Sequence, residues 1–196
     1  MKFIGITGGV GAGKSVILSY IREHYNAKVV LADDLAKTLM LPDQECYQAI
    51  RQVFDGYDVF AEDGIIEPRA MAAVLFSDDS LRQQMNHIVH PAVKRFVLAE
   101  VKKERERGNI DYYFFESALL IEDEYDKLCD EMWYIFTSEE NRRARLKAGR
   151  GYSDDKISSI FASQMSEATF REHCKVVIDN NGTPEEAVEN IRKILG

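Results

Sequence analysis

No apolar stretch of this 196-residue chain is long enough to cross a membrane, which takes about 18 consecutive apolar residues. The first apolar run is also too short for a signal peptide. Cysteine is scarce: the three cysteines (46, 129 and 174) lie far apart, without a CxxC pair or a His/Cys metal spacing. Positive charge is in deficit, and the formal net charge of −8 argues against a general nucleic-acid binder. These absences predict a cytoplasmic protein with buried thiols. We expect small-molecule partners rather than nucleic acid or a membrane, and a monomer or a weak homo-oligomer.

Five short apolar runs predict β-strands, at residues 2–7, 27–32, 110–116, 131–137 and 174–179. They are apolar almost throughout rather than alternating, which is typical of strands covered on both faces of a parallel sheet. Helical segments lie between them, so the pattern predicts an α/β fold with a parallel sheet of about five strands wrapped by helices.

The interval from about 42 to 108 has no convincing strand and predicts a helical insertion with room to cover a second substrate. We therefore expect a single domain over 1–196, with a core at about 1–41 and 109–196. Two helices have clear signals in this core. "KSVILSYIREHY" places Val16, Ile17, Tyr20 and Ile21 on one face, and Thr183 with Pro184 marks the start of a C-terminal helix.

The most specific motif is "GGVGAGKS", which fits the P-loop pattern G-x-x-x-x-G-K-[ST] between a strand and a helix. Glycines allow backbone N–H groups to surround a phosphate, and the positive end of the following helix points at it. Lys14 then neutralises the β- and γ-phosphates, and the Ser15 hydroxyl is a ligand for Mg²⁺. The motif predicts that ATP binds at Gly8, Gly9, Gly11, Ala12, Gly13, Lys14, Ser15 and Val16.

A basic cluster, "NRRARLKAGRG", stands out in an otherwise acidic chain. It suits a lid, at about 140–165, whose Arg142, Arg145 and Arg150 close on phosphates. A solvated helix face is the alternative for each single arginine. The lid, the insertion and the lack of an NKxD-type guanine motif favour a small-molecule kinase over a switch GTPase or a motor ATPase.

Acidic residues follow two of the predicted strands. Asp33 and Asp34 come at the end of the second strand, and Glu116 ends the third. The carboxyl ends of parallel strands face the ligand crevice, so these carboxylates are candidates to accept a proton from an attacking hydroxyl or to hold Mg²⁺ through water. We favour Asp33 for this role and a first-turn helix position for Asp34. His87 and His90 lack a nearby third ligand for zinc.

Several separated segments together resemble the dephospho-CoA kinase family. They are "IGITGGVGAGKS", "VLADDLAK", "IEPRAMAAVLFSD", "HIVHP", "ESALLIE", "SSIFASQMS" and "VVIDNNG", which run from one end of the chain to the other. Three positions depart from the usual family pattern: Pro68 stands for Asp, Ala118 for Pro and Lys37 for Arg.

The resemblance implies transfer of phosphate from ATP, with Mg²⁺, to the ribose 3′-hydroxyl of dephospho-CoA. It puts Asp33 on the family's catalytic aspartate, with Lys14 as the second catalytic residue. It adds Asn180 to the ATP site, and Asp33, Arg69, His90, Glu122 and Gln164 to the acceptor site. A nucleoside-monophosphate kinase shares the loop, insertion and lid, and a non-enzymatic nucleotide-binding regulator shares the loop, so both alternatives stay open here.

Overall fold

The computed structural model describes residues 1–196, which divide into two compact units. The sheet unit comprises Met1–Val30 and Gly108–Gly196, and the helical unit comprises Leu31–Arg107. The helical unit begins earlier than the insertion expected from the sequence because α2 (Ala32–Leu39) packs against α5 (Asp79–Arg107). No helix combines the length and apolar character that a membrane crossing requires.

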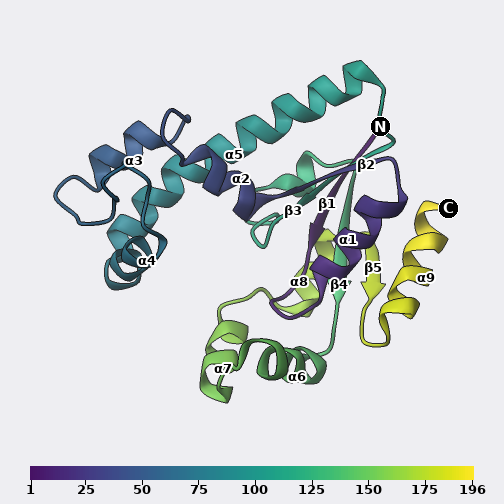
Figure 1. Ribbon diagram of the computed structural model, residues 1–196. Coiled ribbons are helices and arrows are strands. Elements are labelled where there is room, and N and C mark those ends of the chain that lie inside the picture. Colours follow the sequence, from purple (N-terminus) through teal and green to yellow (C-terminus); the bar gives the residue numbers. More distant parts are fainter. The chain divides into compact units, whose positions relative to one another are not determined.

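The sheet unit is built on five strands in the order β2-β3-β1-β4-β5 (Figure 1). Their bounds are β1 Lys2–Thr7, β2 Ala27–Leu31, β3 Tyr112–Glu116, β4 Glu131–Phe136 and β5 Val176–Asp179. β1 pairs in parallel with β3 on one side and β4 on the other, and β4 pairs in parallel with β5. The predicted five-stranded parallel sheet with flanking helices is confirmed.

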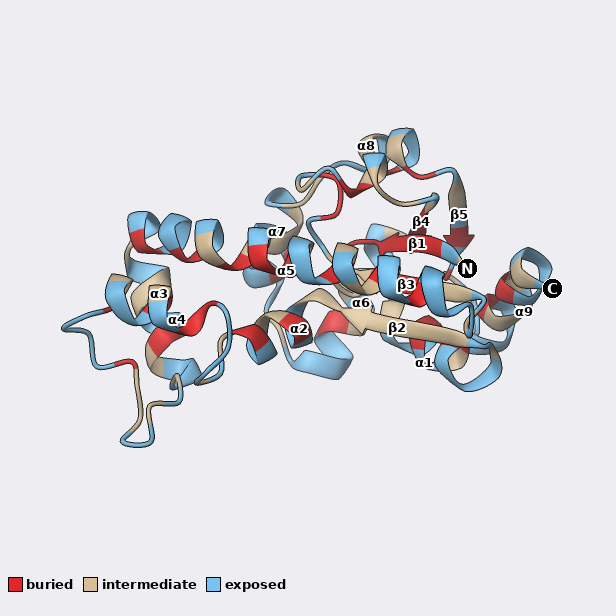
Figure 2. Cartoon of the chain, turned by 90° about the horizontal axis from the view of Figure 1, so that it is seen from above, coloured by how far each residue is buried: buried red, intermediate tan, exposed pale blue.

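Burial differs between the middle and the edges of this sheet. β1, β3 and β4 are buried over most of their length, whereas every residue of β2 is only partly buried (Figure 2). In β5, Val177 keeps 36% of its surface exposed. The expectation of buried strands therefore holds for the three central strands only. β2 and β5 are the edge strands, and each has a paired neighbour on one side, so the other side leaves its residues partly exposed.

The sheet unit contains five helices, α1 (Lys14–His24), α6 (Glu139–Arg150), α7 (Asp154–Ala162), α8 (Glu167–His173) and α9 (Pro184–Leu195), and a short 3₁₀ helix η1 (Tyr125–Lys127). α1 packs beside α9, and α8 packs on β4. The predicted start of α9 is confirmed, since Thr183 and Glu186 form a reciprocal capping box.

The buried face of α1 differs from the predicted one. Ile17, Leu18 and Ile21 are buried, but Val16 is 48% exposed and Tyr20 is partly exposed. Leu18 and Ile17 lie three and four residues before Ile21 and share its side of the helix, which turns Val16 toward solvent.

The helical unit packs α2, α3 (Tyr47–Val53) and α4 (Pro68–Ser77) against α5. α5 supplies the longest apolar stripe of the unit, from Leu81 through Met85, Val89 and Val93 to Val97 and Val101. Pro68, which departs from the family pattern, takes the first position of α4, where its missing N–H costs no hydrogen bond. An antiparallel bridge between Phe60 and Ile66 closes the turn before α4.

Candidate active site

The glycine loop, residues 8–13, connects the buried end of β1 to the start of α1. Gly8 has a φ of 154°, and a Cβ atom there would lie 2.6 Å from the carbonyl oxygen of Ile135 in β4. Gly13 has a φ of 83° and is the N-cap of α1. No side chain caps this helix end, and its first turn has no acidic residue. Uncapped N–H groups and the positive end of α1 together make this loop suitable for an anion.

Lys14 lies over the loop and next to a carboxylate. Its Nζ donates a hydrogen bond to the carbonyl oxygen of Gly8 at 2.7 Å and lies 3.4 Å from Oε1 of Glu116. Both side chains are more than four-fifths buried. Glu116 ends β3, in register with Ile6 of β1, so sheet pairing brings this predicted acidic residue to the loop.

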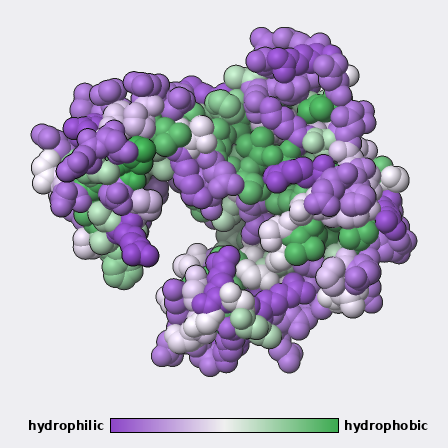
Figure 3. Space-filling view, in the orientation of Figure 1, coloured by the Kyte–Doolittle hydropathy of each residue, from purple (hydrophilic) through white to green (hydrophobic).

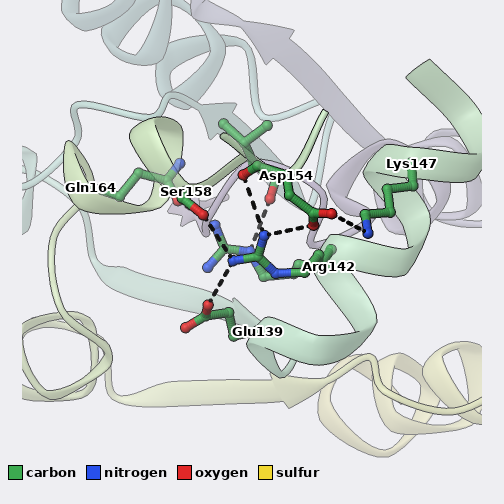
Figure 4. Close-up of polar contacts among 8 residues, drawn as sticks. Glu139, Arg142, Lys147, Asp154, Ser158 and Gln164 are labelled. Carbon is green, nitrogen blue, oxygen red and sulfur yellow. Dashed lines mark hydrogen bonds and ion pairs between the residues drawn. The ribbon is translucent and has the colours of Figure 1, made fainter. Parts of the chain in front are cut away.

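Arg142 of α6, far from the loop in the sequence, contacts the same loop. Its Nε donates to the carbonyl oxygen of Val10 at 2.9 Å, and its Nη2 donates to the side chain of Gln164 (Figure 4). The guanidinium carbon lies 4.2 Å from the centre of the Phe161 ring. Burial lowers the pKa of Arg142 from its ordinary value. A Cβ atom on Gly9 would lie 2.3 Å from this guanidinium, so the glycine makes room for the arginine.

The other two predicted lid arginines differ from each other. Arg145 donates from Nη2 to the carbonyl oxygen of Asn180 at 2.7 Å, and Nη1 lies 3.4 Å from the carbonyl oxygen of Ala12. Arg150 is exposed at the end of α6, with its guanidinium carbon 5.9 Å from the centre of the Tyr152 ring. Arg142 and Arg145 therefore both contact carbonyl oxygens of the loop, and Arg145 also contacts Asn180. Arg150 contacts Tyr152 instead.

Charged contacts hold α7 against α6. Arg143 of α6 donates to Asp154 at 3.2 Å and to the Ser158 hydroxyl at 3.3 Å, both on α7, and Lys147 of α6 pairs with Asp154 at 2.8 Å (Figure 4). Within α6, Arg143 also donates to Glu139 at 3.2 Å. The surface of this helix pair, at the bottom of Figure 3, is largely hydrophilic. Each exposed pair contributes little alone, but here the contacts share residues and form a network.

The helical unit contains the predicted site residues Asp33, Arg69 and His90, and also Asp34. Asp33 and Asp34 lie in the first turn of α2, not at the end of the strand, because β2 ends at Leu31 and the helix begins at Ala32. Both are exposed, and Asp34 pairs with Lys37 at 3.0 Å, whereas no hydrogen bond or ion pair engages Asp33. Arg69 is exposed in the first turn of α4, and His90 is partly buried in α5.

The remaining predicted residues belong to the sheet unit. Glu122 is exposed in the turns that follow β3, Gln164 contacts Arg142 after the end of α7, and Asn180 is 6% exposed just after β5. Sequence reasoning missed Thr137, a buried residue directly after β4 whose hydroxyl contacts the loop. Its signal was its place at the carboxyl end of a strand, the same rule that singled out Glu116.

The fold is that of a P-loop kinase with an anion-binding loop. It combines a parallel sheet, a glycine loop at the carboxyl end of β1, and a lysine and arginines around that loop. Comparisons with known proteins narrow this class. The family model for dephospho-CoA kinase matches residues 2–186.

A curated dephospho-CoA kinase from Geobacter sulfurreducens is 35% identical over 195 residues, covering 99% of this chain and 97% of that protein. A crystal structure of a protein from Thermus thermophilus has a TM-score of 0.79 at 25% identity, covering 99% of this chain and 96% of that one. A dephospho-CoA kinase from Campylobacter jejuni has a TM-score of 0.71 at 17% identity, covering 98% and 96%, and supports the fold alone. The chain belongs to the dephospho-CoA kinase family.

Proposed function

We propose that this chain transfers the γ-phosphoryl group of ATP to the ribose 3′-hydroxyl of dephospho-CoA, giving coenzyme A and ADP. As a member of its family over nearly its full length, it is a transferase and catalyses the last step of coenzyme A biosynthesis. The observation that carries the proposal is this family match, because the glycine loop alone is shared by many kinases.

The sheet unit supplies the ATP site in this proposal. Backbone N–H groups of the loop and the uncapped start of α1 bind the phosphates, and Lys14 neutralises charge between the β- and γ-phosphates. Arg142 and Arg145, already held at the loop, add positive charge from α6. Asn180 donates a hydrogen bond to the Ala12 carbonyl oxygen of the loop and belongs to the same ATP site. Residues of about 140–165, with Arg150 at the end of α6, close over ATP as a lid.

Mg²⁺ belongs to the same proposal. The Ser15 hydroxyl is exposed in the first turn of α1, next to Lys14. No group of three or more His, Cys, Asp or Glu side chains is arranged to hold a metal. A single hydroxyl donor, that of Ser15, fits Mg²⁺, which is commonly bound by few protein oxygens together with substrate phosphates. The bound ion supplies charge neutralisation at the transferred phosphoryl group.

Asp33 is the proposed general base. Its exposed carboxylate has no hydrogen-bond or ion-pair partner in the chain, while the neighbouring Asp34 is engaged by Lys37. Because Lys37 pairs with Asp34 and acts on Asp33 only through its charge, the Asp33 carboxylate is available to orient the acceptor hydroxyl and take its proton. Arg69, His90, Glu122 and Gln164 are the proposed acceptor contacts, for which the family resemblance is the support.

A matched pair of variants tests the base assignment. Asp33→Asn keeps the shape but removes the charge and the proton acceptor, so we expect unchanged ATP binding and turnover at least about 10²-fold slower. Asp34→Asn is the control and should lose far less. Turnover is followed by coupled ADP release with dephospho-CoA, and nucleoside monophosphates are run as competing acceptors. Full activity of Asp33→Asn would contradict the assignment, and faster transfer to a nucleoside monophosphate would contradict the acceptor.

The cellular setting and the oligomeric state are also proposals. All three cysteines are free, and burial raises the pKa of Cys129 and of Cys174 to about 12, so both thiols stay protonated and unreactive. Unpaired thiols suit the reducing cytoplasm, and we propose that the enzyme works there as a monomer or a weak homo-oligomer.

A further inference from the structure

We infer that Thr137 is a positioning residue for ATP binding, which acts by fixing the orientation of the Ala12–Gly13 peptide in the glycine loop. This inference rests on the proposed binding of ATP at that loop. Thr137 follows β4 directly, is only 3% exposed, and its Oγ1 lies 3.0 Å from the carbonyl oxygen of Ala12. A buried polar side chain needs such a partner, because an unsatisfied hydroxyl in the interior is costly.

Three donors from three elements converge on that one carbonyl oxygen. Besides Thr137, Asn180 donates from Nδ2 at 2.7 Å, and Nη1 of Arg145 lies at 3.4 Å. Thr137 and Asn180 follow the paired strands β4 and β5, and Arg145 lies on α6. Ala12 itself is 1% exposed, so this carbonyl is held in the interior by the side chains around it.

The shorter distance favours Ala12 as the acceptor of the Thr137 proton. A hydroxyl carries one proton, and Oγ1 lies within reach of two carbonyl oxygens, those of Ala12 at 3.0 Å and Asn180 at 3.2 Å. Both oxygens also accept from another side chain at 2.7 Å, that of Ala12 from Nδ2 of Asn180 and that of Asn180 from Nη2 of Arg145, so distance decides between them. Oγ1 also accepts from Nη1 of Arg145 at 3.4 Å. The Thr137 hydroxyl therefore links Arg145 of α6 to the Ala12 carbonyl of the loop by two hydrogen bonds.

The consequence for ATP follows from peptide geometry. In a planar trans peptide the C=O and N–H bonds point in opposite directions. Holding the Ala12 carbonyl toward Thr137, Asn180 and Arg145 therefore directs the N–H of Gly13 away from them. Gly13 has a φ of 83°, and its N–H belongs to the loop whose amides surround phosphate in the P-loop pattern. A loop held in the binding orientation loses less freedom when ATP binds.

The decisive comparison is Thr137→Val against Thr137→Ser. Valine keeps the shape of threonine but removes the hydroxyl, and serine keeps the hydroxyl but removes the methyl group. We expect Thr137→Val to weaken the affinity for ATP about threefold to tenfold, the worth of one hydrogen bond, and Thr137→Ser to stay within about twofold of the wild type. Affinity is measured by titration calorimetry with Mg·ATP and no acceptor, and KM for ATP and for dephospho-CoA are measured separately.

A role in ATP positioning predicts a split that a purely structural role does not. KM for ATP should rise in Thr137→Val while KM for dephospho-CoA stays within about twofold. Wild-type affinity for ATP in a folded Thr137→Val, or an equal loss in Thr137→Ser, would overturn the inference. If Thr137→Val does not fold, Thr137→Ala is compared with Thr137→Ser by the same criteria. The calorimetric result needs no acceptor, so it is separate from any failure of dephospho-CoA to react.

Discussion

Replacing Gly8 by alanine tests the close approach between the glycine loop and the sheet. The new Cβ atom would lie 2.6 Å from the carbonyl oxygen of Ile135, on a backbone with a φ of 154°. Ile135 cannot move away freely, because β4 is paired in parallel with β1 on one side and β5 on the other. The strained backbone costs about 1–3 kcal/mol and the steric overlap about as much again, so we expect a loss of about 4 kcal/mol in the free energy of unfolding.

Urea unfolding measures this loss directly. Trp133, the single tryptophan, is fully buried in β4 two residues before Ile135, so its fluorescence reports on the strand that Gly8 contacts. With a slope of about 2 kcal/mol per molar urea, the unfolding midpoint of Gly8→Ala should fall by about 2 M. The assay needs no ATP, so loss of ligand binding does not affect it.

Gly149→Ala is the matched control for this substitution. Gly149 lies within α6, its φ is negative, and a Cβ atom there would meet nothing within 4 Å. Alanine is the better helix former, so this variant should gain about 0.5–1 kcal/mol. A wild-type midpoint for Gly8→Ala, or a loss in Gly149→Ala as large as that in Gly8→Ala, would refute the reasoning from Cβ contacts.

Three further predictions concern the loop and the lid. Lys14→Ala should cut turnover by at least about 10²-fold because it removes charge at the transferred phosphoryl group, while Lys193→Ala on α9 should not, and near-normal turnover of Lys14→Ala counts against the P-loop mechanism. Thr7→Val should stabilise the fold by up to about 2 kcal/mol in urea unfolding, since the buried Thr7 hydroxyl has no hydrogen-bond partner, and a loss above about 1 kcal/mol contradicts this. Proteolysis between residues 144 and 153 should slow when ATP and dephospho-CoA are both bound, whereas equal cleavage favours a static surface.

Much of the fold was predictable because its signals are local. Apolar runs gave the five strands, and the cap at Thr183 gave the start of α9. The glycine motif gave the loop because it depends on consecutive residues. The sequence-based prediction is wrong where adjacent residues suit the same position equally well. It places Val16 on the buried face of α1, although Val16 is exposed, and it places Asp33 at the end of β2, although Asp33 lies in α2.

The contacts that support the loop were not predictable for a different reason. Arg142 and Asn180 bind carbonyl oxygens of residues 132 and 168 positions away in the chain, and Thr137 binds one 125 positions away. No sequence period links such residues, because the packing of α6 and of strands β4 and β5 decides which side chain faces which carbonyl. The basic cluster pointed to Arg142 and the resemblance to Asn180, whereas Thr137 had only its place after a strand and no motif.

The position of the transferred phosphate tests the central claim most directly. The purified chain is incubated with ATP, Mg²⁺ and dephospho-CoA, and the product is examined by ³¹P NMR alongside measurement of ADP. We expect one new phosphomonoester, coupled to the ribose 3′ position, for each ADP formed. ADP without a phosphorylated acceptor, or a phosphate at any other position of dephospho-CoA, would contradict it.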